Sequence, residues 1–154
     1  MGNTYTNVAV HIIFHTKNGC PKIEESDLPQ LFQYIGGVIK TMSGVAYIVG
    51  GRPDHVHVLT LLPSSISLAD FVRTIKANSS RRIKEINPYY EILAWQRGFG
   101  AFAVSQSNKG AVIEYITHQK EHHKHKTAHE EFQQFLEKNG LLMQGEPQAN
   151  NAEN

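Results

Sequence analysis

Residues 53–62 read PDHVHVLTLL, and this stretch decides the fold. Branched and apolar side chains dominate it in the pattern of a buried β-strand. Because side chains on a strand alternate between its two faces, His55 and His57 point the same way, roughly 6 to 7 Å apart. Two neutral imidazoles on a rigid strand supply much of a divalent-metal site. We therefore predict a metal or catalytic pair that needs a third ligand, with a structural role as the alternative.

The composition is that of an ordinary globular protein. The chain has 154 residues, of which 40% are hydrophobic and 19% charged, so we expect one domain over residues 1–140. No signal-peptide pattern and no apolar run near the ~20 residues of a membrane helix is present, which predicts a cytoplasmic protein without a membrane partner. The single cysteine, Cys20, excludes an intrachain disulfide and a thiolate zinc cluster. The net charge of +1 does not by itself indicate a nucleic-acid binder.

The elements around this stretch predict the fold class. Strand patterns cover residues 4–16, 45–49, 53–62 and 99–105, and helical spacing covers 28–42 and 68–86. Ser26 or Asp27 is a plausible cap for the first helix, and Ser67 caps the second. The order predicts an α+β fold of the ferredoxin-like split β-α-β type, with an antiparallel sheet.

In that topology the first and third strands are the central neighbours, so the histidine pair lies mid-sheet. Two helices then cover one face, and a C-terminal helix lies on or near the other. His11 and His15 of the first strand could approach the pair, although a buried structural role is the simpler reading.

The second helix carries a basic stripe with little acid among it. Its members are Arg73, Lys76, Arg81 and Lys84. Such a stripe is either a phosphate-contacting surface or merely a solvated face.

A segment starting near residue 108 supplies the other half of a site. Tyr115 and Gln119 are four residues apart, so on a helix they share a face. If that face docks on the histidine pair, Gln119 supplies an oxygen ligand and the Tyr115 hydroxyl lies near an ion-bound substrate oxygen. A phenolate attacks phosphorus well, and a metal-polarised phosphate lowers the demand on it. A helix tyrosine with a solvated hydroxyl is the alternative.

Five histidines and a polar tail complete the chain. The histidines are His118, His122, His123, His125 and His129. They are compatible with a second zinc site, but neighbouring lysines favour DNA-backbone contact or simple exposure. Residues 141–154 lack apolar periodicity and are expected to be a disordered tail.

Three motifs in order resemble the single-tyrosine HUH transposases of insertion sequence 200 and their relatives, in which U is a hydrophobic residue. They are PDHVH at 53–57, WQ at 95–96 followed by GFGAFAVS at 98–105, and YI at 115–116 followed by Gln119, Glu121, His122 and His123. The resemblance covers roughly residues 4–140.

The resemblance implies a transposase that cleaves and rejoins single-stranded DNA at hairpin-bearing element ends. Tyr115 would be the nucleophile that forms a 5′-phosphotyrosine link, and His55, His57 and Gln119 would bind Mg²⁺ or Mn²⁺. It also implies a homodimer, with each tyrosine helix often completing the partner's site, and no nucleotide cofactor.

Two alternatives accompany this expectation. One is a domesticated or inactive relative that binds DNA hairpins without cutting them. The other is a histidine-triad nucleotide hydrolase, in which a third histidine attacks the α-phosphate, but that position is Leu59 here.

Overall fold

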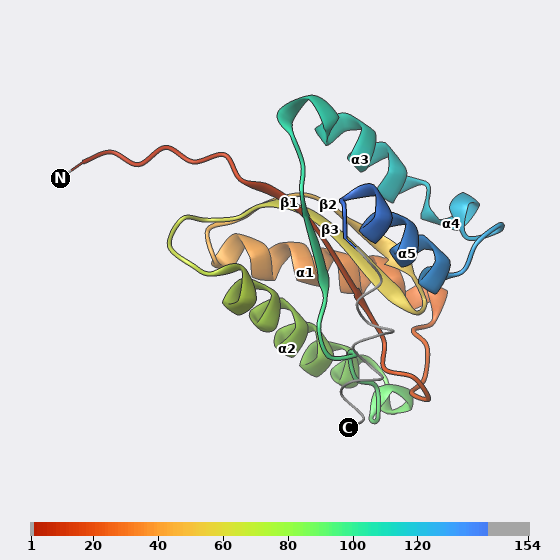
Figure 1. Ribbon diagram of the computed structural model, residues 1–154. Helices are drawn as coiled ribbons and strands as arrows, with labels where there is room; N and C mark the ends of the chain where they lie inside the picture. Colours follow the sequence, from red (N-terminus) through yellow and green to blue (C-terminus); the bar gives the residue numbers. More distant parts are fainter. Residues whose placement is uncertain (1, 142–154) are drawn as a thin grey trace, which may run out of the picture. The chain divides into compact units, whose positions relative to one another are not determined.

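The computed structural model describes residues 2–141, and its first part alternates strands and helices in the expected order (Figure 1). The strands are β1 (Ala9–His15), β2 (Val45–Arg52), β3 (His55–Leu61) and β4 (Gly100–Ala103). The helices are α1 (Leu28–Thr41), α2 (Leu68–Ile86), α3 (Lys109–Thr117), α4 (Gln119–His122) and α5 (Ala128–Lys138). Short 3₁₀ turns cover Glu25–Asp27, Pro88–Tyr90 and Gln106–Asn108.

The sheet has the order β2-β3-β1-β4, and each pair of neighbours is antiparallel. This confirms the ferredoxin-like α+β prediction, with β1 and β3 in the centre. β1 is shorter than the predicted strand over residues 4–16, because its partner β3 ends opposite Ala9 at Leu61. β2 is longer than predicted and runs to Arg52, directly opposite His55.

The two faces of the sheet have different compositions. Val10, Ile12 and Phe14 of β1 and Val56 and Val58 of β3 belong to the hydrophobic core formed with α1 and α2. The alternate residues of the same strands, among them His11, His55 and His57, occupy the opposite face. The central strands thus bury hydrocarbon on one side and present imidazoles on the other.

Helix capping follows the prediction at α2 but not at α1. The Ser67 side chain accepts a hydrogen bond from the Asp70 backbone N–H, as expected. Asp27 occupies the N-cap position of α1, but its side chain makes no capping bond. Its carboxylate instead accepts a hydrogen bond from the Tyr90 hydroxyl, so the cap predicted for this side chain was wrong.

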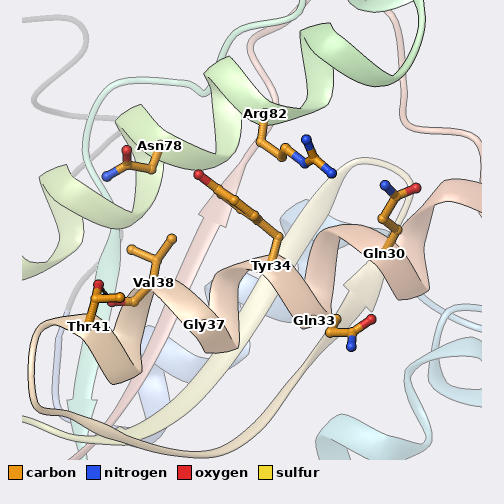
Figure 2. A pocket seen from close by; sticks show the side chains of 8 residues that line it. All are labelled: Gln30, Gln33, Tyr34, Gly37, Val38, Thr41, Asn78 and Arg82. Atoms are coloured by element: carbon orange, nitrogen blue, oxygen red, sulfur yellow. Dashed lines mark hydrogen bonds between the residues drawn. The ribbon is translucent and has the colours of Figure 1, made fainter.

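A cavity lies between α1 and α2, on the side of the sheet away from the histidines (Figure 2). Its volume is about 650 Å³. The residues that line it are Gln30, Gln33, Tyr34, Gly37, Val38, Thr41, Asn78 and Arg82. The Arg82 guanidinium of α2 lies over the Tyr34 ring of α1, 5.7 Å from its centroid, and this cation–π contact links the two helices.

The chain divides into two compact units at residue 120, Met1–Lys120 and Glu121–Asn154. In the second unit the structure describes α5, which opens with a capping box between Thr127 and Glu130. The chain leaves this helix at Gly140, which adopts φ +72°. The expected single domain over residues 1–140 stays a prediction, and the expected tail lies, apart from Leu141, outside the described residues. Within residues 2–141, no helix has the length and apolar character needed to cross a membrane.

Candidate active site

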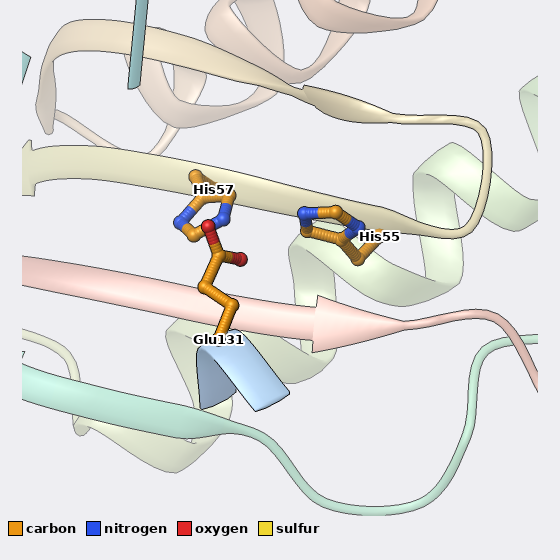
Figure 3. Close-up of side chains that lie close together, drawn as sticks. All are labelled: His55, His57 and Glu131. Carbon is orange, nitrogen blue, oxygen red and sulfur yellow. The ribbon is translucent and has the colours of Figure 1, made fainter. Parts of the chain in front are cut away.

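His55 and His57 stand side by side on β3, as Figure 3 shows. Both side chains are buried, and their ring centroids are 5.1 Å apart. A ring nitrogen of each lies within 4.8 Å of one from the other. The two rings are therefore close enough to be candidates for holding one cation.

Helix α3 can approach the histidine pair because a glycine, Gly50, lies beneath it on β2. Gly50 lies directly opposite His57 in the β2–β3 register. A Cβ at Gly50 would lie 2.8 Å from Cγ2 of Ile116 and 3.1 Å from its carbonyl oxygen. The missing side chain thus leaves the space that α3 fills. At the start of the helix, Lys109 holds its ammonium 4.2 Å from the centroid of the Tyr47 ring on β2.

The docked helix brings the other two predicted site residues to the histidines. The half-buried Tyr115 ring lies edge-on to His57, with 6.0 Å between ring centroids. Gln119 is buried, and its Oε1 lies 2.9 Å from Nε2 of His55. The structure therefore brings together, within one chain, all four residues predicted for catalysis and metal binding.

A continuous helix from residue 108 was expected to carry both Tyr115 and Gln119, but Gln119 lies beyond the end of α3. Helix α3 ends at Thr117, and His118 is its C-cap, with its backbone N–H bonded to the Glu114 carbonyl at 3.1 Å. The His118 ring Nδ1 also lies 2.8 Å from that carbonyl oxygen. Gln119 is then the first residue of α4 and still faces His55. The predicted approach of Gln119 to the histidine pair therefore occurs across a break between two helices and not along one continuous helix.

The hydrogen bonding of His55 tests whether these residues suit a cation. Asp54 Oδ1 lies 2.7 Å from Nδ1 of His55, and a carboxylate only accepts, so Nδ1 carries the proton. This bond with the His55 ring lowers the pKa of Asp54. In neutral His55 the lone pair of Nε2 then faces the lone pairs of the Gln119 carbonyl oxygen. A ring nitrogen and an amide oxygen placed in this way are donor atoms of the kind that suit a divalent ion.

The sequence prediction did not include Asp54 among the site residues. The turn is fixed from both sides, since the Asp54 carbonyl accepts from the Thr16 N–H at 2.9 Å and the Pro53 carbonyl accepts from the Ile23 N–H at 2.9 Å. An acidic residue directly before a candidate metal-binding histidine was the available signal, because carboxylates commonly orient such rings.

The first strand adds two more rings to the same face. His11 Nε2 lies 2.8 Å from Nδ1 of His57, and the His15 ring stacks on His55 with centroids 5.6 Å apart. The approach considered from the sequence is therefore realised, because β1 and β3 are neighbours with His15 directly opposite His55.

The predicted basic stripe lies on α2, which packs on the other face of the sheet, and several of its members already have partners. Arg73 pairs with Asp70, and Arg81 donates to Asn78. Lys76 donates to the carbonyl oxygens of Gln96 and Gly98, at 2.8 Å each. Partial burial lowers the pKa of Lys76. Lys76 thus ties α2 to the segment before β4, while Arg73, Arg81 and Lys84 are exposed.

The second unit contains most of the histidine cluster. Nδ1 of His123 lies 2.8 Å from the Lys126 carbonyl oxygen. Its Nε2 lies 3.2 Å from Oε2 of Glu131, the α5 side chain that Figure 3 also draws. His123 therefore has a local role within its unit, and a second metal site there stays untested.

Comparisons with known proteins agree with the order of these elements. The family described as "Transposase IS200 like" matches residues 4–119. The chain is 21% identical in sequence to the "putative transposase from Deinococcus radiodurans R1", with a TM-score of 0.59 over 77% of this chain and 96% of that one. It is 16% identical to a REP-associated tyrosine transposase solved with a REP hairpin, with a TM-score of 0.58 over 80% of this chain and 73% of that one. No curated protein matches the chain.

At these identities the two solved structures show a shared fold, whereas the family match rests on the sequence itself. That match runs from the residues before β1 to Gln119, and so includes both the histidine pair and Tyr115. The chain therefore belongs to the IS200-like transposase family.

Proposed function

We propose that this chain cleaves and rejoins single-stranded DNA at hairpin-bearing element ends, with Tyr115 as the nucleophile. One observation carries the proposal. Tyr115 lies against His57, and Gln119 against His55, inside a single chain. Family membership supports DNA cleavage and rejoining in general, and this arrangement supports the tyrosine mechanism in particular.

His55, His57 and Gln119 are the proposed ligands of Mg²⁺ or Mn²⁺. Two imidazole nitrogens and an amide oxygen leave further positions for water or phosphate oxygens. When bound, the ion would supply Lewis-acid polarisation of the scissile phosphate. Asp54 holds the His55 ring so that Nε2 is directed at Gln119.

Tyr115 performs the covalent step. Its hydroxyl loses a proton, and its oxygen attacks the scissile phosphorus. The phosphorus–O3′ bond breaks, and O3′ of the upstream strand takes up a proton. The phosphorus stays on the 5′ end of the downstream strand, which becomes linked to Tyr115 as a 5′-phosphotyrosine. The hydroxyl of another 3′ end reverses the step and joins a new strand. Because one phosphodiester replaces another throughout, no nucleotide cofactor is required.

DNA recognition in the proposal uses a hairpin at the element end. The neighbour solved with a REP hairpin supports this choice of partner. Arg81 and Lys84 are the members of the basic stripe best placed to contact phosphate, since both are exposed, whereas the exposed Arg73 pairs with the Asp70 carboxylate. We also propose a homodimer in the cytoplasm that joins through an edge strand of the sheet, either β2 or β4.

The test uses single-stranded oligonucleotides copied from the DNA that flanks the gene, incubated with the full chain and Mg²⁺. Wild type should form a protein–DNA adduct that survives denaturing gel electrophoresis, and Tyr115→Phe should not, although it still binds the hairpin. Tyr89→Phe is the matched control, because Tyr89 is 47% exposed on a 3₁₀ turn far along the chain from Tyr115.

Each result separates the alternatives. An adduct that persists in Tyr115→Phe would place the nucleophile elsewhere and contradict the proposal. Hairpin binding by wild type without any adduct would instead indicate a binding protein that lacks the chemistry.

A further inference from the structure

His11 lies outside the residues to which a function was assigned above, yet it contacts one of them directly. It lies on the central strand β1, two residues along from Ile13, which faces His57 in the register. This diagonal position on the same face is within reach of an aromatic side chain. The two rings stack with 5.0 Å between centroids and an interplanar angle of 29°. His11 is 1% exposed, so the contact is a buried one.

The contact restricts where the protons lie. His11 Nε2 and His57 Nδ1 are 2.8 Å apart, and a neutral imidazole has one N–H donor and one acceptor nitrogen. If His11 Nε2 donates, His57 must carry its own proton on Nε2, and that nitrogen cannot bind a cation. If His57 Nδ1 donates to His11, the lone pair of His57 Nε2 is available.

We propose that His11 is a positioning residue that accepts the hydrogen bond from Nδ1 of His57 and so holds His57 in the tautomer whose Nε2 can bind the ion. The inference rests on the proposed function, in which His57 is a ligand. His11 touches neither the substrate nor the ion in this role, and it acts only through His57.

His55 shows the same arrangement with a different acceptor, which supports the assignment. Its Nδ1 is bound by the Asp54 carboxylate at 2.7 Å, and its Nε2 is directed at Gln119. Both histidines of the pair thus have Nδ1 engaged, His55 by Asp54 in the turn before β3 and His57 by His11 on β1. Metal-bound histidines commonly use their second ring nitrogen in this way.

The difference between the acceptors also has a chemical consequence. A second carboxylate at His57 would add negative charge near a site that must admit a DNA phosphate. Neutral His11 accepts the hydrogen bond from Nδ1 without adding that charge. Phe102 of β4 meets the His11 ring edge-on, at 6.3 Å between centroids and 68°, and helps to fix the plane of the ring.

Two substitutions separate the acceptor from the packing. His11→Leu fills the buried position with an apolar side chain and removes the Nε2 acceptor. His11→Gln places an amide oxygen, which also accepts, close to the position of Nε2. Ile13→Val is the matched control, since Ile13 is buried on the same strand directly opposite His57 and contributes no polar atom.

The measurement is Mn²⁺ affinity of the full chain, from the electron paramagnetic resonance signal of free Mn²⁺. Loss of a residue that orients a metal ligand typically costs 10- to 100-fold in metal affinity. We therefore expect His11→Leu to bind Mn²⁺ at least about 10-fold more weakly than wild type, with His11→Gln and Ile13→Val within about 3-fold. Affinity of His11→Leu equal to wild type would overturn the inference.

A second readout needs no metal and no substitution of His11. Nitrogen-15 correlation spectra of the metal-free wild type report the tautomer of each histidine, with His57 assigned from the resonance missing in His57→Ala. The expected result is protonation at Nδ1 of His57, and protonation at Nε2 would overturn the inference even if His11→Leu failed to fold. If wild type bound Mn²⁺ no better than His57→Ala, the proposed metal site itself would be refuted. If wild type bound Mn²⁺ better than His57→Ala but no better than His11→Leu, only the role of His11 would be refuted.

Discussion

Gly50→Ala is predicted to impair DNA cleavage by displacing a helix rather than by touching the reacting groups. The added Cβ would lie 2.8 Å from Cγ2 of Ile116, whereas ordinary contacts begin at 3.4 Å. Helix α3 must therefore shift by at least about 0.6 Å, and the carbonyl oxygen of Ile116 at 3.1 Å blocks the alternative of rotating the side chain alone. Tyr115 precedes Ile116 directly, so the shift reaches the proposed nucleophile.

The size of the effect follows from the geometry of catalysis. A misplacement of about 1 Å can cost on the order of 100-fold in rate, so we expect adduct formation by Gly50→Ala to fall by about 10- to 100-fold. Overpacking of this kind costs about 1 to 3 kcal/mol in unfolding free energy, so the variant should remain folded. Single-turnover adduct formation with saturating oligonucleotide measures the rate, and urea unfolding measures the stability.

Gly110→Ala is the matched control, because this glycine lies on the same helix and a Cβ there would meet nothing within 4 Å. It should cleave at the wild-type rate and be as stable as wild type or slightly more so. A folded Gly50→Ala variant that cleaves as fast as wild type would refute the reasoning, since docking of α3 on β2 would then not be what places Tyr115.

Three further predictions concern stability, the assignment of the site to one chain, and DNA binding. Tyr90→Phe should lose about 1 to 3 kcal/mol of unfolding free energy at pH 7, because the Tyr90 hydroxyl donates to Asp27 and accepts from the Glu24 N–H. Burial and the Asp27 bond raise the pKa of Tyr90 to about 12 from 10.0, so the wild-type advantage should be complete below about pH 10 and disappear as the pH rises through about 12; equal urea stability of the two proteins at pH 7 would contradict this. A mixture of Tyr115→Phe and His57→Ala chains should form no adduct, because Tyr115 lies beside His57 of its own chain, and recovery of a large fraction of wild-type activity on mixing would show that the tyrosine acts in a partner's site. Replacing both Arg81 and Lys84 by Gln should lower the slope of log affinity against log salt for hairpin binding by about 2, and an unchanged slope in a binding titration would remove the stripe from the DNA interface.

Strand order and the placement of the histidine pair could be predicted because they rest on strong periodic signals. The alternation at 53–62 sets the face of His55 and His57, and the order of strands and helices makes β1 and β3 neighbours. Element ends were less predictable, since they depend on partners. The first strand begins at Ala9, where β3 runs out, and not where its own alternation begins at residue 4.

The contacts that orient the site depend on register, which periodicity does not give. That His11 reaches His57 follows from the pairing of Ile13 with His57. That α3 comes close depends on Gly50, which lies opposite His57 in the register and which no sequence prediction connected with the site. Likewise the side chain of Asp27 matched a cap pattern locally, but the hydroxyl of Tyr90, 63 residues away, bonds to it instead.

The most direct test of the central claim measures whether the Tyr115 ring and the histidine pair share one ion. The chain has six tyrosines, and uniform 3-fluorotyrosine labelling gives each a fluorine resonance, with that of Tyr115 identified by its loss in Tyr115→Phe. On stoichiometric addition of Mn²⁺, relaxation of the fluorine at Tyr115 should increase strongly, and the effect should vanish in His57→Ala. A Tyr115 resonance that is no broader than that of the remote Tyr89, in a chain that demonstrably binds Mn²⁺ through His57, would contradict the account.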